Sequence, residues 1–287
     1  MVGRTSVLLS SYTCKWSLGF RKFQPDVPKP LSWFVDIAAT HGLDGVQFAD
    51  NVTPERLSDA DVEAIASYAG RKGIKLQWGF DGWEDELVRR MIAICRLSGA
   101  SQLRGVFGPA FGGSGPREAR ITAAVRAVQK VLPELEQYGI VLSLENHFDL
   151  KVRELLEVVN SVGTPLVRIC LDTTNAIGEL LRPAEVIELL GPCSVSMHLK
   201  DFRIEKIVGG YTILGVAVGE GNQDCKGVLA AARAVNPDIE VCIELGAPWP
   251  DPPEKMFEIE ARDTRVSIEN TLMYLRTQHD ILRGSEV

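Results

Sequence analysis

Four ionisable residues stand near the ends of four separate apolar runs of the chain. They are Glu145, Asp172, His198 and Glu244, and the runs begin at Ile140, Val167, Val195 and Ile239. An unpaired buried charge is costly, so such residues are not expected at buried strand ends without a partner or a task. If the four runs are neighbouring parallel strands, their ends converge on one spot. Three carboxylates and one imidazole at one spot predict a divalent-metal site.

The spacing of these residues indicates how they are positioned. Asp172 follows Glu145 by 27 residues, and His198 follows Asp172 by 26, which is the length of one strand-plus-helix unit in each case. Glu244 follows His198 by 46 residues, which fits one such unit plus an insertion over 201–225. In a parallel barrel every strand ends on the same face, and that face carries the active site.

Strand-like and helix-like segments alternate along the whole chain, which gives eight strand–helix units. Strands are predicted at 5–12, 44–49, 74–79, 101–107, 140–147, 166–172, 193–199 and 239–245. Helices are predicted at 31–41, 57–72, 83–98, 117–138, 150–162, 183–190, 226–235 and 255–282. Two loops are longer than a connection needs: residues 108–116 are rich in Gly and Pro, and residues 201–225 are predicted to form a β-hairpin over the end of the seventh strand.

The helix boundaries carry the expected residues. Glycines suited to left-handed C-caps stand at positions 42, 73, 99, 139 and 163, Ser58 and Asp59 begin the second helix, and Pro183 suits a first helical turn. We therefore predict an α/β fold in which residues 1–287 form a single (β/α)8 TIM barrel domain. The alternative is an open doubly wound sheet. That fold usually carries a Gly-rich phosphate turn after the first strand, where this chain has Ser11-Tyr-Thr-Cys-Lys-Trp.

Composition excludes several classes of protein. The chain has 287 residues, a net charge of −7 and a pI near 5.3, which argues against nucleic acid or an anionic membrane as a partner. No apolar run reaches the roughly 20 residues of a membrane span, and the N-terminal segment is interpreted as a strand and not as a signal peptide. The six cysteines form no CxxC pair, so a reduced, cytoplasmic location is expected.

The predicted ligand set is rich in hard oxygen donors. It suits Mn²⁺, Mg²⁺ or Co²⁺, with Zn²⁺ also possible, and we expect one divalent ion, Mn²⁺ in the first place.

Four motifs resemble one known family. ENHFD at 145–149, LDTTN at 171–175, HLKDF at 198–202 and IELG at 243–246 are similar to motifs of the xylose isomerase-like TIM barrel superfamily of sugar isomerases and epimerases. The resemblance extends over the whole chain and implies that Glu145, Asp172, His198 and Glu244 bind one divalent ion. It also implies that Glu145 and Glu244 act as the catalytic acid and base on opposite faces of the substrate. This agrees with the chemistry of an enediolate that a metal ion stabilises.

Further positions are predicted to bind substrate. His147 lies two residues beyond Glu145, Asn175 three beyond Asp172, and Lys200 shares a strand face with His198. Arg203 is predicted to clamp a carboxylate or phosphate of the substrate. Many relatives have a histidine where this chain has Asn175 and a glutamate where it has Gln47, which argues against chemistry that depends on those groups.

The leading function is therefore a metal-dependent isomerase or epimerase of a small polyhydroxylated keto substrate. The main alternative is a lyase, a dehydratase or decarboxylase of a keto-sugar acid or inosose on the same site. An apurinic endonuclease would need more than the four histidines present, and a non-catalytic sugar-binding barrel would not need both glutamates. The resemblance also implies a homodimer or homotetramer, for which the segment 255–282 is the candidate interface.

Overall fold

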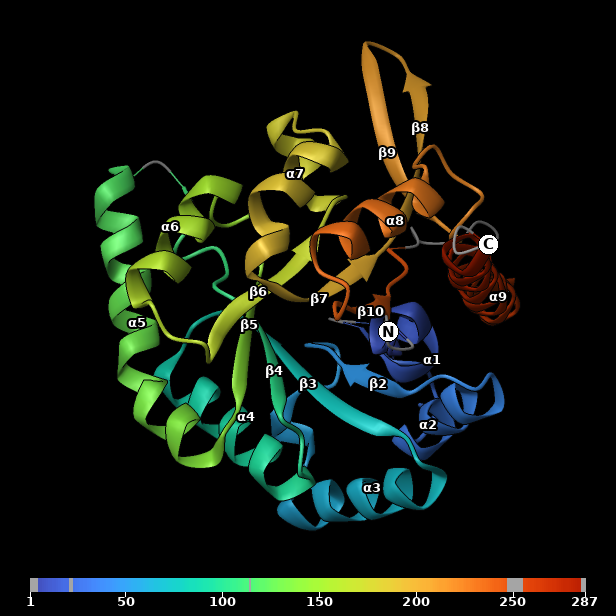
Figure 1. The fold of residues 1–287 in the computed structure, drawn as a ribbon. Helices are drawn as coiled ribbons and strands as arrows, with labels where there is room; N and C mark the ends of the chain where they lie inside the picture. Colours follow the sequence, from blue (N-terminus) through green and yellow to red (C-terminus); the bar gives the residue numbers. More distant parts are fainter. Residues whose placement is uncertain (1–4, 21–22, 114, 247–254, 285–287) are drawn as a thin grey trace.

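Eight short strands pair in parallel and close into a barrel in the computed structural model, which describes residues 5–20, 23–113, 115–246 and 255–284 (Figure 1). Around the barrel the order is β1, β10, β7, β6, β5, β4, β3 and β2. The strands are β1 (Val7–Ser10), β2 (Gly45–Phe48), β3 (Lys75–Asp81), β4 (Gln102–Val106), β5 (Val141–Glu145), β6 (Val167–Asp172), β7 (Ser194–Leu199) and β10 (Glu240–Ile243). The predicted single (β/α)8 barrel is confirmed, and the doubly wound alternative is wrong.

Helices surround the barrel and cover the outer side of the strands (Figure 1). They are α1 (Lys15–Leu18), α2 (Leu31–Thr40), α3 (Asp59–Lys72), α4 (Asp85–Ser98), α5 (Arg117–Tyr138), α6 (Val152–Val162), α7 (Pro183–Leu190), α8 (Cys225–Val235) and α9 (Met256–Gly284). The caps follow the sequence. Ser58 forms a capping box with Asp61 at the start of α3, and all five predicted C-cap glycines have a positive φ.

The barrel has an apolar outside and a polar inside. Phe48, Trp78 and Leu103 are fully buried in the hydrophobic core that includes the helices. Strand residues next to them point inward instead, since side chains alternate across a strand. The lumen therefore contains polar groups such as Gln47 and Gln77, and this inner row leads to the ends of the strands, where the ionisable residues lie.

Several strands are shorter than predicted, and the ends of two of them affect the site. The first ends at Ser10, because the chain turns into a 3-10 helix, η1 (Ser11–Cys14), whose first turn the Ser10 hydroxyl caps. The fifth ends at Glu145 and does not reach His147. His147 therefore lies on the following loop and does not continue the strand face of Glu145.

The insertion after β7 forms the predicted hairpin. β8 (Asp201–Ile207) and β9 (Gly210–Val216) pair as a separate antiparallel ribbon that stands out from the barrel (Figure 1). Its base is held by Asp201, whose carboxylate accepts hydrogen bonds from the backbone N–H groups of Phe202, Gly219, Gly221 and Gln223. Within the described residues, no helix is both long and apolar enough to cross a membrane.

Candidate metal centre and active site

The structure brings the four predicted metal ligands together at the carboxyl ends of their strands. All four are at least nine-tenths buried: Glu145, Asp172, His198 and Glu244. His198 Nδ1 lies 2.7 Å from Glu244 Oε2, 3.4 Å from Glu145 Oε1 and 3.9 Å from Asp172 Oδ2. Donors about 2.1 Å from one ion are separated by roughly 3 to 4.2 Å. The 3.4 and 3.9 Å distances fall within that range, and the 2.7 Å contact between His198 and Glu244 is shorter than it.

Three buried atoms of this cluster that could bind a metal ion have no hydrogen-bond partner among the described residues. They are Asp172 Oδ2, His198 Nδ1 and Glu244 Oε2. Each of them does have a charged neighbour: His198 Nδ1 and Glu244 Oε2 lie 2.7 Å apart, and Asp172 Oδ2 lies 2.8 Å from Lys200 Nζ. The three atoms are thus ion-paired but not satisfied by regular hydrogen bonds, which is unusual for buried polar atoms. A divalent cation would satisfy all three at once, and the residues present therefore fit the metal that the sequence predicts.

Hydrogen bonds to the loops hold Asp172 in place. Its Oδ1 accepts hydrogen bonds from the backbone N–H groups of Thr174 and Asn175 at 2.8 and 3.0 Å. The side chain of Asn146 bridges from the end of β5 to the backbone N–H and carbonyl of Asp172. These hydrogen bonds hold the other carboxylate oxygen, Oδ2, facing the cluster.

Arg104 is a buried cation that the sequence analysis missed. It lies within β4 and is 4% exposed. Its Nε lies 2.5 Å from Glu145 Oε2, its Nη2 also contacts that oxygen, and its Nη1 lies 3.3 Å from Asp50 Oδ1. The available signal was an arginine inside an otherwise apolar strand, because a charge there needs a buried partner.

Charge pairing governs the ionisation of the two glutamates. Burial alone would raise the pKa of Glu145, but attraction to Arg104 and His198 lowers it well below its usual range. Burial opposes ionisation of Glu244 as well, yet attraction to His198 and Lys200 lowers its pKa to about 2. Both carboxylates are therefore ionised at neutral pH, as metal ligands must be.

Lys200 places its ammonium group among the ligands. Its Nζ lies 2.8 Å from Asp172 Oδ2, 3.5 Å from Glu244 Oε1 and 3.9 Å from Glu145 Oε1. The contact with Asp172 Oδ2 is an ion pair that does not satisfy hydrogen-bond geometry. Lys200 also lines the cavity above the cluster, so it joins the ligands to the space where a substrate would bind.

That cavity has a volume of about 500 Å³ and opens over the ligand cluster. Of the predicted site residues, Glu244, His147, Asn175 and Lys200 line it, together with Arg104, Asp50, Asp81, Tyr12 and Lys15. Glu145, Asp172 and His198 are not among the lining residues. Arg203 is also outside the lining; it is exposed on β8 and donates a hydrogen bond to the backbone carbonyl of Glu220.

The two substrate-binding candidates next to Glu145 differ in their surroundings. Asn175 Nδ2 donates a hydrogen bond to Glu145 Oε1 at 2.9 Å. His147 is half-buried, and its ring meets that of Phe148 edge to face, with the ring centres 4.6 Å apart. The sulfur of Cys170 lies within 4.8 Å of atoms of Glu145 and His198 that could bind a metal ion.

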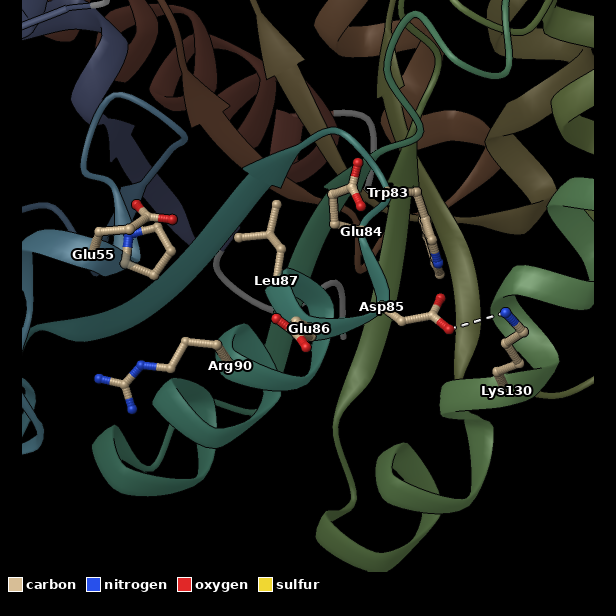
Figure 2. A pocket seen from close by; sticks show the side chains of 9 residues that line it. Glu55, Trp83, Glu84, Asp85, Glu86, Leu87, Arg90 and Lys130 are labelled. Carbon is tan, nitrogen blue, oxygen red and sulfur yellow. Dashed lines mark hydrogen bonds and ion pairs between the residues drawn. The ribbon is translucent and has the colours of Figure 1, made fainter.

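A second hollow, of about 860 Å³, lies around the start of α4 and contains none of the predicted site residues. Figure 2 shows its side chains: Asp85 reaches Lys130 of α5 at 2.9 Å, whereas Arg90 points away from that pair toward Asp59. Its four acidic residues, Glu55, Glu84, Asp85 and Glu86, are all exposed, and the described residues form no metal-ligating group there. The smaller cavity above the four ligands is the candidate active site.

Comparison with known proteins shows the family of the chain. The family model described as "Xylose isomerase-like TIM barrel" matches residues 35–265. The 3-oxo-isoapionate decarboxylase of Pectobacterium atrosepticum is 31% identical over 275 residues, which cover 94% of this chain and 95% of that protein.

Two solved structures share the fold at low sequence identity. A zinc-bound IolI protein matches with a TM-score of 0.74 at 17% identity, over 95% of this chain and 98% of that one. A D-psicose 3-epimerase studied in the presence of D-fructose matches with a TM-score of 0.69 at 16% identity, over the same shares of the two chains. The chain is therefore an enzyme that belongs to the xylose isomerase-like TIM barrel family.

Proposed function

We propose that this protein is a divalent-metal-dependent decarboxylase of a small polyhydroxylated 3-oxo acid. This is the lyase alternative of the sequence analysis, and it is favoured here over the isomerase or epimerase. The similarity to a 3-oxo-isoapionate decarboxylase over nearly the whole of both chains supports it.

The observation that carries the proposal is the unequal placement of the two glutamates. Glu244 lines the cavity, whereas Glu145 lies below it, with one oxygen bound by Arg104 and the other by Asn175. An epimerase with two bases needs a proton carrier on each side of the reacting carbon. A decarboxylase removes no proton from carbon and needs only one proton donor after CO₂ has left, so it does not require a second carboxylate base in the cavity.

The residues have distinct tasks in this reaction. A divalent ion held by Glu145, Asp172, His198 and Glu244 would polarise the keto oxygen of the substrate. The C–C bond to the carboxylate breaks, CO₂ leaves, and the electron pair moves into an enolate whose carbon then takes up one proton. The Lys200 ammonium lines the cavity and contacts Asp172, so it would stabilise the developing negative charge and supply that proton.

Other cavity residues recognise the substrate. His147 and Asn175 are placed to hydrogen-bond its hydroxyl groups, and Arg104 holds Glu145 as a ligand and not as a free base. Arg203 lies outside the cavity lining, so its predicted role as an anion clamp is not part of this proposal. The oxygen-rich ligand set supports Mn²⁺ as the working metal.

The test is an incubation of the Mn²⁺-loaded protein with a panel of 3-oxo sugar acids in D₂O. We expect release of CO₂ faster than in the enzyme-free control, because such acids also decarboxylate slowly on their own. The product should carry one solvent deuterium on the carbon that lost the carboxylate. Deuterium exchange into a product of unchanged mass formula, without CO₂, would instead identify an isomerase or epimerase and exclude the decarboxylase.

A further inference from the structure

A row of buried amide side chains connects His198 to the opposite mouth of the barrel. Gln47 is fully buried in the lumen, and its Oε1 lies 2.9 Å from His198 Nε2. Gln47 Nε2 donates to Gln77 Oε1 at 3.1 Å, and Gln77 Nε2 donates in turn to the carboxylate of Glu240. Gln77 Nε2 also contacts Gln102 Oε1 at 3.2 Å. The path starts at the carboxyl end of β7 and finishes at the first residue of β10.

Glu240 is firmly held at the far end. Its Oε2 accepts a hydrogen bond from Ser6 Oγ at 2.8 Å and lies 3.7 Å from Lys75 Nζ. Both carboxylate oxygens of Glu240 accept hydrogen bonds, Oε1 from Gln77 and Oε2 from Ser6, so Glu240 gives the row a direction. Glu240 requires the NH₂ group of Gln77 to face it, which turns the oxygen of Gln77 toward Gln47.

The orientation of Gln47 in turn determines which ring nitrogen of His198 carries a proton. Gln77 offers an oxygen, so Gln47 must present its NH₂ group there and its own oxygen to His198. That oxygen needs an N–H, which places the ring proton of His198 on Nε2. Nδ1 then faces Asp172, Glu145 and Glu244, with Glu244 Oε2 2.7 Å away, and it is the ring nitrogen that a metal ion would take.

We propose that Gln47 and Gln77 are positioning residues that, anchored by Glu240, hold His198 with its proton on Nε2 so that Nδ1 is available to a metal ion. Metal-bound histidines usually donate their second N–H to a carboxylate, carbonyl or water, and loss of that partner weakens metal binding about 10–100-fold. In this chain the carboxylate is that of Glu240, and it acts on His198 through the amide side chains of Gln77 and Gln47. The inference depends on the metal site of the proposed function, but not on the reaction catalysed there.

Zinc titration of matched variants tests this. Zn²⁺ affinity is measured on the full chain by competition with a chromophoric chelator, for the wild type and for Gln47→Leu, Gln47→Glu, Gln77→Leu and Gln102→Leu. Gln102 is the control, because it is a lumen glutamine of the same size that donates to Ser143 and Ser196 and has no hydrogen bond with Gln47 or His198 among the described residues. It also accepts from Gln77 Nε2, but Gln77 keeps its hydrogen bonds with Gln47 and Glu240 without it. NMR of the ¹⁵N-histidine-labelled, zinc-bound protein reports the ring proton, and only four histidines need assignment.

We expect Gln47→Leu to lower zinc affinity about 10–100-fold, and Gln77→Leu to lower it less. Gln47→Glu keeps an acceptor for His198 but loses the donor to Gln77 Oε1, so its affinity should lie between those of Gln47→Leu and the wild type, and Gln102→Leu should leave the affinity unchanged. The NMR signal of the His198 Nε2 proton should be protected from solvent exchange in the wild type and lost in Gln47→Leu.

Wild-type zinc affinity in Gln47→Leu would overturn the inference. An equal loss in Gln102→Leu would do so too, since it would show a general packing defect. A wild type that binds no zinc would remove the metal site itself. A wild type that binds zinc but releases no CO₂ from any acid would reject the decarboxylase alone.

Discussion

Replacing Arg104 by methionine is expected to destabilise the protein strongly, although the two side chains are similar in length. Arg104 is 4% exposed and Glu145 is 1% exposed, so the substitution leaves a carboxylate buried without its closest cation. Breaking one side of a buried ion pair typically costs 3–5 kcal/mol. For a domain of this size we expect a fall in Tm on the order of 10 °C.

A double-mutant cycle with Glu145→Gln isolates the contribution of the pair. Free energies of unfolding in urea, measured with a chelator present, should show that Arg104→Met with Glu145→Gln costs about 2–3 kcal/mol less than the two single changes together. Added Mn²⁺ should recover part of the loss in Arg104→Met, because a cation at the ligand cluster again neutralises Glu145. A cost below about 1 kcal/mol for Arg104→Met, or strict additivity in the cycle, would refute the assignment of Arg104 as the buried counter-ion.

Three further predictions concern single residues. Glu244→Gln should lower kcat at least about 100-fold while the circular dichroism spectrum is unchanged, and a fully active variant would remove Glu244 from the mechanism. Lys200→Met should lower kcat by a factor on the order of 100. It should also tighten Mn²⁺ binding, because the ammonium no longer contacts Asp172 Oδ2; weaker binding in a calorimetric titration would contradict this. Burial raises the pKa of Glu260 to about 7, despite hydrogen bonds from Ser17 and Trp16, so its ionisation costs stability as pH rises from about 4.5 to 7. Relative to the wild type, Glu260→Gln should gain on the order of 3 kcal/mol between about pH 4.5 and pH 8 in urea unfolding, and a difference independent of pH would contradict it.

The fold and the ligand cluster could be predicted from sequence because both depend on regular spacing. Strand length and helix length fix where each strand ends, and a parallel barrel brings all the ends to one face. Glu145, Asp172 and His198 are the last or next-to-last residues of β5, β6 and β7, and Glu244 directly follows β10. Predicting that these four residues converge therefore required only the number of strands and their alternation with helices.

What could not be predicted depends on contacts between strands that are distant in sequence. Arg104 is paired with Glu145 of the next strand, and this pairing decides that Glu145 lies below the cavity. Gln47 and Gln77 each follow the alternating pattern of an ordinary strand, and only closure of the barrel aligns them with His198. The position of Arg203 depends on the twist of a ribbon that stands away from the barrel, which local sequence does not determine.

Metal stoichiometry is the most direct test of the central claim, that the four strand-end residues hold one divalent ion. Equilibrium dialysis against Mn²⁺, followed by elemental analysis, should give one ion per chain for the wild type. Asp172→Asn and His198→Gln should each lose the ion at the same free Mn²⁺ concentration while keeping the circular dichroism spectrum of the barrel. Wild-type occupancy in both variants, or no bound ion in the wild type, would contradict the assignment of the site.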